Sequence, residues 1–350
     1  MIFGKKIQSV GLDIGSRTIK VAEAEEKKKK WVLKKFGMMD IGPGLIEDGS
    51  IRNPEGVAEA IRQLFKANRI KESNTAISVG GYSVIVKNIS IQTMEETQLR
   101  ETIQFEAEQY IPFDINDVNL DFQILGENAE NPNQMDVVLV AAKKEIVNDY
   151  VNLVQMAGLN PCIMDVDAFA LQNIYTANYD TEGENVALID IGANKTTLNI
   201  LKGTFSVFMR DVSLGCHQIS SKIVSLSGCS LEEAEELYNT EKSDKISSKE
   251  LVDIVTSVVT DWCTEIRRAL DFFYSTYPND QIRKIVLSGG GANIKKFRQL
   301  LGVETSSEVE MINPFSKFSV DSSFDDSYLE KIAPQAAIAM GLAMRRVNDK

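Results

Sequence analysis

Residues Val10–Glu23 read VGLDIGSRTIKVAE, and residues Ala187–Gly203, about half a chain later, read ALIDIGANKTTLNILKG. In both stretches apolar residues run into Asp-Ile-Gly, small polar residues follow, and an alternating apolar pattern resumes. This pattern predicts a strand, a tight turn and a second strand. Because it occurs twice, we expect two halves of similar architecture.

Each Asp-Ile-Gly turn has the residues that a phosphate-binding hairpin needs. Glycine lets backbone N–H groups approach anionic oxygens, and an Asp at the strand end can orient Mg²⁺ together with substrate phosphate. Lys20, in the strand after the first turn, is placed to reach the phosphates. An ordinary hairpin whose Asp caps its own turn remains the alternative for one copy, but the repetition favours the phosphate interpretation.

A third motif, KIVLSGGGANIKKF (Lys284–Phe297), joins an apolar strand to a helix through three glycines. Such a turn forms a crevice for a flat polar ligand, although it recurs in many α/β folds. It matches neither the dinucleotide fingerprint G-x-G-x-x-G nor the phosphate loop G-x-x-x-x-G-K-[ST]. The two commonest nucleotide-binding folds are therefore excluded.

The rest of the chain reads as strands and helices around these motifs. In the first half we predict strands Ile7–Leu12, Ile19–Ala24 and Trp31–Met38, a helix in Asn53–Ile70 and a strand in Thr75–Gly81. Between Tyr82 and Asn160 we predict strands Ser83–Ile91, Val118–Leu125 and Asp136–Ala142, and helices Met94–Ile111 and Glu145–Ala157. The second half follows with strands Val186–Ile191, Thr196–Lys202, Thr204–Arg210 and Lys284–Leu287, and helices Cys216–Leu226, Leu231–Thr240, Lys249–Tyr277 and Ile294–Leu301.

The composition excludes several classes of protein. A formal charge of −12 over 350 residues argues against nucleic acid as a partner. No stretch is long and apolar enough to span a membrane, and the start, MIFGKK, has no signal-peptide core, so a cytoplasmic protein is expected. The four cysteines lack metal-ligand spacing, and one histidine makes zinc enzymes and Ser-His-Asp hydrolases unfavourable. The basic run Lys27–Lys35 reads as a solvated hairpin turn, with contact to anionic lipid as the alternative.

Taken together, Asp-Ile-Gly-Ser with its Lys, the second Asp-Ile-Gly with its Thr, and the late SGGGA resemble the phosphate-1, phosphate-2 and adenosine motifs of the actin-like ATPases. MDVDAFALQNIY (Met164–Tyr175) falls where the first connecting helix of that fold belongs, and APQAAIAMGLAMR (Ala333–Arg345) where the last one does. A subdomain inserted in the first half resembles the FtsA and PilM arrangement. The MIFGKK lead, DIGA-x-x-T-x-L-N and D-V-D-A-F-A-L are similar to PilM, the cytoplasmic actin-like component of type IV pilus assembly.

The resemblance implies an α/β actin-like ATPase fold, with two related β-β-β-α-β-α halves and a small inserted α/β subdomain. It places the first half at 1–82, 161–185 and 334–350, the insert at 83–160, and the second half at 186–333 with a smaller part at about 211–277.

The resemblance also implies ATP and Mg²⁺ as ligands. Asp13 and Asp190 would face one Mg²⁺ from the two halves. The implied ATP-binding residues are Asp13, Gly15, Ser16, Arg17, Thr18, Lys20, Asp190, Gly192, Asn194, Thr196, Gly215, Glu232, Glu235, Gly289, Gly290, Gly291 and Asn293. For the two glutamates, a solvated helix face is the alternative.

Two departures from hydrolytic relatives concern catalysis. DnaK-type chaperones have Asp-x-Gly-Gly-Gly-Thr-x-Asp at the second phosphate motif, whereas here Ala193, Asn194 and Lys195 replace the later glycines and the Thr, and Thr197 replaces the final Asp. In the first connecting helix, Asp167 stands where those relatives carry a water-orienting Glu or Gln. Asp167 is the candidate catalytic base, with helix capping as the alternative. At most weak ATPase activity is expected.

The implied partner is the N-terminal cytoplasmic tail of the inner-membrane protein PilN, and indirectly PilO, which would place the protein at the inner membrane. The tail would dock as an extended segment between the first half and the inserted subdomain. Two alternatives are an FtsA-like filament protein and a small-molecule kinase. Self-association remains open in the PilM interpretation as well.

Overall fold

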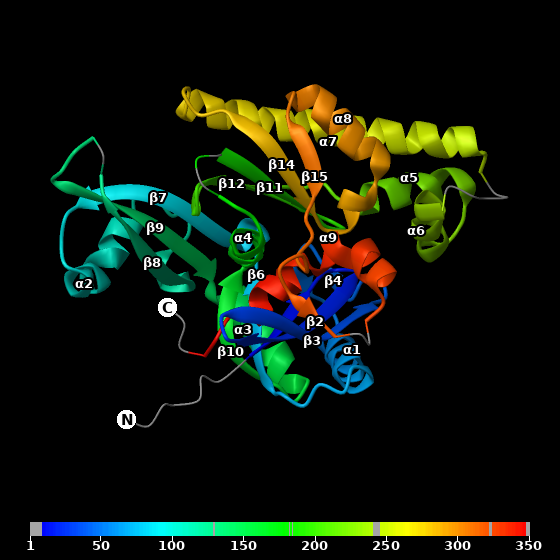
Figure 1. Cartoon of the computed structure of the whole chain (residues 1–350), viewed down its shortest axis with the longest axis horizontal. Helices are drawn as coiled ribbons and strands as arrows, with labels where there is room; N and C mark the ends of the chain where they lie inside the picture. Colours follow the sequence, from blue (N-terminus) through cyan, green and yellow to red (C-terminus); the bar gives the residue numbers. More distant parts are fainter. Residues whose placement is uncertain are drawn as a thin grey trace.

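The computed structural model describes residues 9–128, 130–181, 183, 185–240, 246–321 and 324–347. The MIFGKK lead and the first two residues of the predicted strand Ile7–Leu12 lie outside these residues. Figure 1 shows two large sheets, one above the other, and a smaller sheet to one side.

The first large sheet carries the first Asp-Ile-Gly turn, and its strand order is β10-β6-β1-β2-β3-β16. Its strands are β1 (Val10–Ile14), β2 (Thr18–Lys27), β3 (Lys30–Asp40), β6 (Asn74–Val79), β10 (Asn160–Val166) and β16 (Ser319–Val320). β1 pairs antiparallel with β2 and parallel with β6. Lys28 and Lys29 have φ of 51° and 64°, so the basic run makes the tight β2–β3 turn, as the hairpin interpretation predicts.

The second large sheet repeats this arrangement in the order β13-β12-β11-β14-β15. Its strands are β11 (Asn185–Ile191), β12 (Thr196–Lys202), β13 (Phe205–Val212), β14 (Ile282–Ser288) and β15 (Glu308–Met311). β11 pairs antiparallel with β12 and parallel with β14. Asp13 faces Lys20 across the first hairpin and Asp190 faces Thr197 across the second, so the two turns occupy equivalent positions.

The smaller sheet, at the left of Figure 1, has the order β7-β9-β8. It consists of β7 (Val84–Gln92), β8 (Val118–Glu127) and β9 (Gln134–Lys143), with α2 (Glu96–Ala107) packed on it. Next in the chain is α3 (Lys144–Met156), which buries Tyr150, Leu153 and Val154 in the core of the first half, against α1 (Pro54–Ala67). The first half also contains two short strands, β4 (Ile46–Glu47) and β5 (Ser50–Ile51).

Two helices, α4 (Asp167–Asn178) and α9 (Asp326–Ala343), pack against each other between the large sheets. The core around them contains Ala22 and Leu33 of the first sheet together with Leu188 and Leu201 of the second. The remaining helices cover the second sheet and its edge: α5 (His217–Ser227), α6 (Leu231–Thr240), α7 (Ser248–Thr276) and α8 (Lys295–Thr305). Ser247 and Glu250 form a capping box that starts the long α7.

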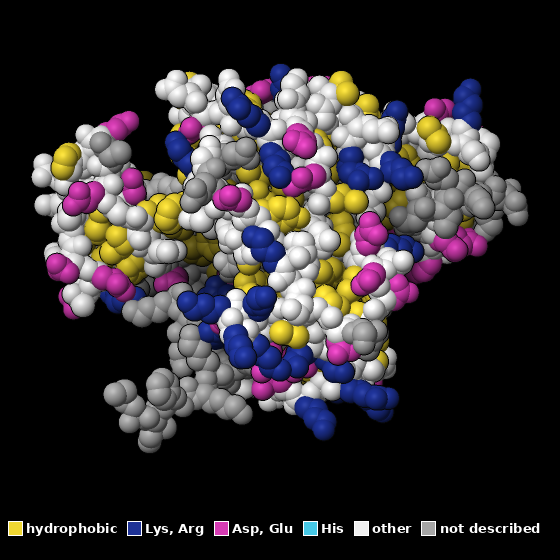
Figure 2. All heavy atoms as spheres, viewed as in Figure 1, with side chains coloured by type: hydrophobic (Ala, Val, Ile, Leu, Met, Phe, Trp, Pro, Cys, Tyr) yellow, Lys and Arg dark blue, Asp and Glu magenta, His cyan; other side chains and the backbone are white. Residues whose placement is uncertain are grey.

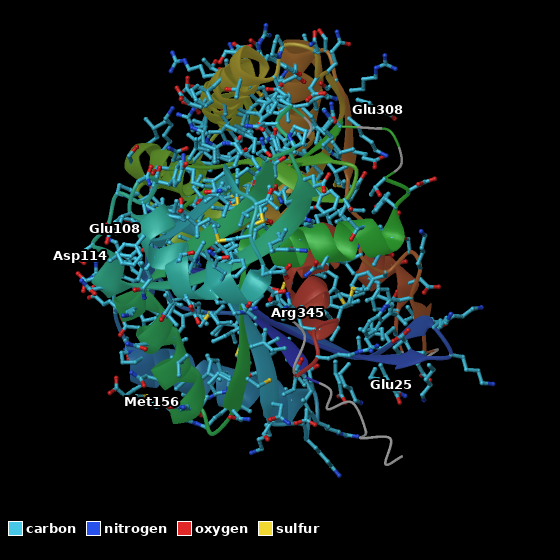
Figure 3. All side chains as sticks on the ribbon, turned by 90° about the vertical axis from the view of Figure 1, so that its left-hand side faces the viewer. Glu25, Glu108, Asp114, Met156, Glu308 and Arg345 are labelled. Carbon is cyan, nitrogen blue, oxygen red and sulfur yellow. The ribbon has the colours of Figure 1, made fainter. Side chains whose placement is uncertain are left out.

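The predicted helix Met164–Tyr175 is partly wrong, because its first three residues belong to β10 and the helix begins at Asp167. The backbone of Met164–Val166 pairs in parallel with β6, and this tertiary pairing has no local signal. Beyond α9 lies Arg345, which is labelled in Figure 3. Its Nη1 donates to Asp165 Oδ2 at 2.8 Å and ties the C-terminal segment to β10. In the described part of the chain, no helix is both long and apolar enough to cross a bilayer.

Candidate functional site

The first Asp-Ile-Gly turn is closed by a hydrogen bond from Gly15 N to Thr18 O at 3.2 Å. A Cβ on Gly15 would lie 2.8 Å from the same oxygen, so only glycine fits there. Asp13 is buried at the end of β1, and Lys20 Nζ lies 3.0 Å from its Oδ2. Ser16 lies in the turn, and Thr18 Oγ1 donates to Asp40 Oδ1 at 3.3 Å. The predicted lysine and carboxylate therefore meet beside the turn.

The second turn is closed in the same way, by Gly192 N donating to Lys195 O at 2.9 Å. Asn194 is half-buried within it. Thr196 Oγ1 donates to Leu214 O at 3.0 Å, which means that this predicted phosphate ligand uses its hydroxyl proton inside the protein. A Cβ on Gly215 would lie 2.3 Å from Ala193 O, so Gly215 is required for close packing against the turn.

The glycines of the third motif also pack on the second turn. Gly289 has a φ of 81°, and a Cβ on it would lie 2.3 Å from Ile191 O. A Cβ on Gly291 would lie 2.3 Å from Ile191 Cγ2. Gly290 has more room, and Asn293 is exposed at the end of the short 3-10 turn. Since Gly289 N also donates to Pro334 O of α9 at 2.9 Å, the loop is fixed from both sides.

Asp190 is a half-buried carboxylate at the end of β11, and Ser288 Oγ donates to its Oδ1 at 2.6 Å. Desolvation, together with the negative charges of Asp13 and Asp167, raises the pKa of Asp190 to about 6, against the opposing effects of Ser288 and Lys20. Burial and the charge of Asp167 likewise raise the pKa of Asp13, against the effect of Lys20. The ends of β1 and β11 thus bring negative charge together.

Asp167, the candidate base, begins α4 and is held at both oxygens. Ser78 Oγ donates to Oδ1 at 2.7 Å, and Lys195 Nζ donates to Oδ2 at 2.6 Å. Desolvation opposes ionisation, but Lys195, Ser78 and Lys20 outweigh it and hold the pKa of Asp167 below its usual range. The carboxylate is therefore ionised at neutral pH and engaged by an ammonium.

Four participating residues were not predicted as site residues: Ser78, Lys195, Asp211 and Ser288. Thr197 Oγ1 donates to Asp211 Oδ1 at 2.5 Å, and Asp211 also acts electrostatically on Lys195. Lys195 could have been predicted as a site residue, because a lysine inside a phosphate-type turn is unusual. The other three have no local signal, because they reach the site from the ends of β6, β13 and β14.

Two predicted ATP-binding residues contact each other across the halves. Arg17, in the first turn, donates from Nε to Glu235 Oε1 at 2.9 Å and from Nη2 to Oε2 at 2.6 Å. Its Nη1 donates to Ile41 O at 2.8 Å. Glu232 is exposed one turn earlier on α6, and its charge also favours the protonated Arg17. This paired geometry joins the first half to α6 of the second half.

We expect a double-mutant cycle of Arg17→Ala and Glu235→Ala to give a coupling of about 1 kcal/mol in urea unfolding, because the pair is bidentate and largely shielded. Its side chains are 17% and 26% exposed. The control is the Arg62–Glu59 pair of α1, whose side chains are 44% and 53% exposed and which should couple by roughly 0.3 kcal/mol. Equal coupling in the two cycles would contradict the expectation.

The residues present fit a nucleotide with Mg²⁺. Mg²⁺ is usually bound by one or two carboxylates plus phosphate oxygens, and among the described residues Asp190 accepts from the neutral Ser288 Oγ. Within the described residues, no group of three or more His, Cys, Asp or Glu side chains forms a metal site by itself.

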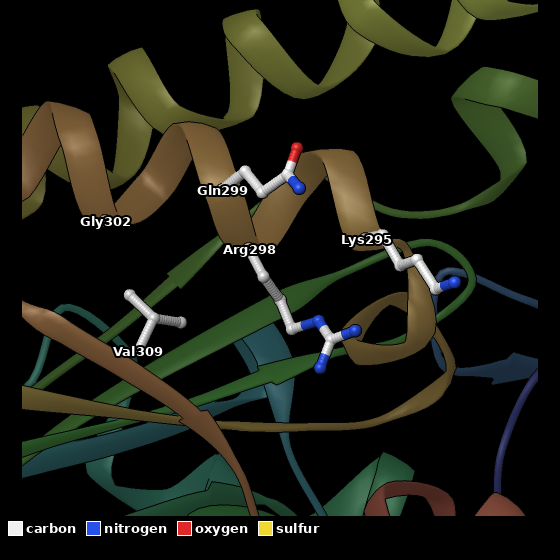
Figure 4. A pocket seen from close by; sticks show the side chains of 5 residues that line it. All are labelled: Lys295, Arg298, Gln299, Gly302 and Val309. Carbon is white, nitrogen blue, oxygen red and sulfur yellow. The ribbon is translucent and has the colours of Figure 1, made fainter.

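A separate surface pocket of about 390 Å³ lies between α8 and β15 (Figure 4). It is lined by Lys295, Arg298, Gln299, Gly302 and Val309. None of the predicted site residues lines it, so the candidate site is defined by the two turns and not by this pocket.

Comparisons with known proteins agree with this arrangement. The family model described as type IV pilus assembly protein PilM matches residues 11–347. A chain of the solved "PilM-PilN type IV pilus biogenesis complex" is 28% identical, with a TM-score of 0.87, and the match covers 99% of this chain and 100% of that chain.

Two further solved structures share the actin-like ATPase fold. They are the ethanolamine utilization protein EutJ from Carboxydothermus hydrogenoformans (13% identity, 98% and 90% covered, TM-score 0.58) and MreB5 of Spiroplasma citri bound to AMPPNP (13% identity, 97% and 95% covered, TM-score 0.51). Both likenesses concern the fold alone. Because the family model covers nearly the whole length of the sequence, the chain belongs to the PilM family of type IV pilus assembly proteins.

Proposed function

We propose that this protein binds ATP with Mg²⁺ between the two Asp-Ile-Gly turns and transmits the occupancy of that site to a pilus partner. The observation that carries the proposal is the convergence of Asp13 and Asp190, from equivalent turns of two halves, at one acidic centre. Their carboxylates would hold the metal. Lys20 and the N–H groups around Gly15 and Gly192 would hold phosphate oxygens, and the loop Gly289–Gly291 with Asn293 would border the adenosine.

Movement between the halves follows from where the bonds lie. Arg17–Glu235 and Lys195–Asp167 each join one half to the other beside the proposed site. A ligand that binds Arg17 would replace its bond to Glu235, while Lys195–Asp167 stays in place, and so would change the angle at which the halves are most stable. Glu232 and Glu235 would then be available for the ribose or adenine.

The partner is proposed to be the N-terminal cytoplasmic tail of a PilN-type inner-membrane protein, and through it PilO. The support is the 28% identical chain, which was solved in a PilM–PilN complex. The tail would add as an extended segment between the first half and the smaller sheet, where β8 is an edge strand with one strand partner among the described residues. Such docking would hold the protein on the cytoplasmic side of the inner membrane.

The charge of this region favours a peptide over a polyanion. Figure 2 shows Asp and Glu side chains gathered on the part formed by α2 and β7–β9. Residues 84–143 contain eleven acidic and three basic side chains. The negative field excludes nucleic acid from this surface.

Isothermal titration calorimetry tests both ligands. We expect ATP with Mg²⁺ to bind, and a synthetic PilN tail to bind with a dissociation constant on the order of micromolar, as for short extended segments. A scrambled tail of the same composition is the control. We further expect the tail affinity to differ between ATP-loaded and nucleotide-free protein. No affinity for the tail in either state would contradict the partner proposal, and no heat with ATP would contradict the nucleotide proposal.

The two alternative functions gain no specific support. The family assignment favours pilus assembly over an FtsA-like division protein or a small-molecule kinase. Self-association remains compatible with the proposal, and sedimentation with and without ATP tests it.

A further inference from the structure

Lys195 occupies an unusual place for a lysine, inside the second phosphate-type turn and facing the other half of the molecule. Its Nζ lies 2.6 Å from Oδ2 of Asp167, the first residue of α4. The two residues are 28 positions apart along the chain. The ion pair therefore spans from the turn of the second sheet to the helix that follows β10 of the first.

The backbone leaves room for the pair because residue 80 is glycine. A Cβ on Gly80 would lie 2.5 Å from Asp167 Oδ2 and 2.5 Å from Lys195 Nζ. The other carboxylate oxygen of Asp167 accepts from Ser78 Oγ at 2.7 Å. Both oxygens of the candidate base are thus engaged, and glycine at position 80 allows the ammonium to reach one of them.

The groups that face the pair fix the lysine in this position. Asp211, held by Thr197, adds a second negative charge that acts on Lys195. Asp13 lies close enough for Asp167 to raise its pKa and for Lys195 to lower it. Moving the ammonium away would leave Asp167 and Asp211 uncompensated in a partly desolvated place, which is costly. The pair is consequently a stable part of the candidate site.

Hydrolysis of ATP would require a base to be available. A bond forms between the water oxygen and the γ-phosphorus, the bond from that phosphorus to the β,γ-bridging oxygen breaks, and a water proton passes to the base while ADP leaves. A carboxylate whose oxygens accept from Ser78 and Lys195 has one acceptor site on each oxygen in use, and its basicity is lowered by the ammonium.

From this geometry we infer that Lys195 is a positioning residue that holds Asp167 in an ion pair across the two halves and so suppresses hydrolysis of the ATP bound there. The inference rests on the proposed nucleotide function and deepens it. ATP then acts as a retained ligand that keeps the two halves in one arrangement. Removal of the lysine is expected to increase the rate at which the site hydrolyses ATP.

The test compares four variants of the full chain: Lys195→Thr, Lys195→Arg, Asp167→Asn and the double variant Lys195→Thr/Asp167→Asn. Threonine is the residue that hydrolytic relatives carry, and arginine keeps the charge. The control is Lys202→Thr, at the other end of β12, where the lysine pairs with Asp280 on the surface. ATP affinity is measured by calorimetry, phosphate release under single-turnover conditions, and the melting temperature without nucleotide.

We expect Lys195→Thr to bind ATP and to release phosphate at least about tenfold faster than the wild type. Lys195→Arg and Lys202→Thr should stay near the wild-type rate, and adding Asp167→Asn to Lys195→Thr should abolish the gain. If Lys195 had only a structural role, its replacement would not cause an increase in phosphate release that depends on Asp167.

The melting temperature without nucleotide gives an independent measurement. Lys195→Thr should lower it by several degrees because Asp167 loses its counter-charge, and the double variant should recover part of that loss. Additive shifts would overturn the inference. If Lys195→Thr proves too unstable to assay, Lys195→Met with Asp167→Asn supplies the same cycle.

The outcomes separate this inference from the proposed function. Wild-type protein that binds no ATP would overturn both. A Lys195→Thr variant that binds ATP and releases phosphate no faster than the wild type would overturn the inference alone.

Discussion

Replacing Gly341 with valine is expected to prevent the protein from accumulating in folded form, and Gly341→Ala to lower the free energy of unfolding by at least about 3 kcal/mol. Gly341 lies in α9 where this helix crosses α4. A Cβ placed on it would be 1.9 Å from Ala170 O and 2.6 Å from Ala170 C. Both atoms belong to the α4 backbone, so no side-chain rotation can relieve the clash.

The size of this effect follows from what the crossing supports. The whole domain is expected to have about 5–15 kcal/mol of stability, so a loss of 3 kcal/mol or more is a large fraction of it. The helices separated by the clash also carry the site: α4 begins at Asp167, and Pro334 O of α9 accepts the hydrogen bond from Gly289 N. Even a folded Gly341→Ala variant should therefore bind ATP more weakly.

Gly302→Ala is the matched control, because it makes the same change inside another helix. The nearest atom to a Cβ on Gly302 is Ser307 O at 3.5 Å, an ordinary contact. Alanine there should be neutral or stabilise α8 by up to about 1 kcal/mol. Urea unfolding followed by circular dichroism measures both variants. Equal midpoints for Gly341→Ala and the wild type would show that the crossing is looser than described.

The parts of the fold that follow from local pattern were predictable, and the parts that depend on distant partners were not. Apolar residues recur in the strands on both sides of the Asp13 and Asp190 turns, and the glycines mark the turns, so the sequence predicts both hairpins. By contrast β15, with the sequence Glu-Val-Glu-Met, is too short and polar to be recognised as a strand. It forms because β14 offers a parallel edge, and Lys284 Nζ pairs with Glu310 Oε1 at 2.7 Å.

The same distinction applies to the site. The electrostatic effect of Asp13 on Asp190 agrees with the family resemblance, which implies that equivalent turns of the two halves face each other. That Glu235 contacts Arg17 could not be predicted, because the contact joins residues 218 positions apart. Nor does any residue near Lys195 indicate that its ammonium reaches Asp167. Sequence motifs specified the turns, whereas the tertiary structure determines which charges compensate each other.

The acidic centre itself should cost stability when no nucleotide is bound. Asp190 has a pKa of about 6 in the folded protein, against an ordinary value of 3.8. Between these values the folded state binds more protons than the unfolded state, so the free energy of unfolding falls as pH rises through this range. The stabilising effect of the protonated group is complete below pH 4 and is lost above about pH 6. At 1.36 kcal/mol per pKa unit, and reduced for the partial exposure of Asp190, the free energy of unfolding falls by about 1–3 kcal/mol over this pH range.

Asp190→Asn is therefore expected to stabilise the nucleotide-free protein while it weakens binding of ATP with Mg²⁺. Asparagine cannot ionise, and its Oδ1 can still accept from Ser288 Oγ, so the variant should be more stable than the wild type by about 1–3 kcal/mol at pH 7.5 and equal to it near pH 4. Loss of one of the two carboxylates proposed to bind the metal should weaken ATP affinity by at least about a hundredfold in Mg²⁺.

Asp253→Asn, at an exposed position of α7, makes the same substitution without a partly buried carboxylate and should change neither quantity. Unfolding is measured from pH 4 to 8 with EDTA present, and affinity by calorimetry with and without Mg²⁺. Parallel stability profiles for Asp190→Asn and the wild type would contradict the raised pKa. Stabilisation without loss of affinity would show that Asp190 does not hold the metal. Only the two results together, a higher free energy of unfolding and a lower affinity for ATP, show that the Asp190 carboxylate serves ligand binding and destabilises the nucleotide-free fold.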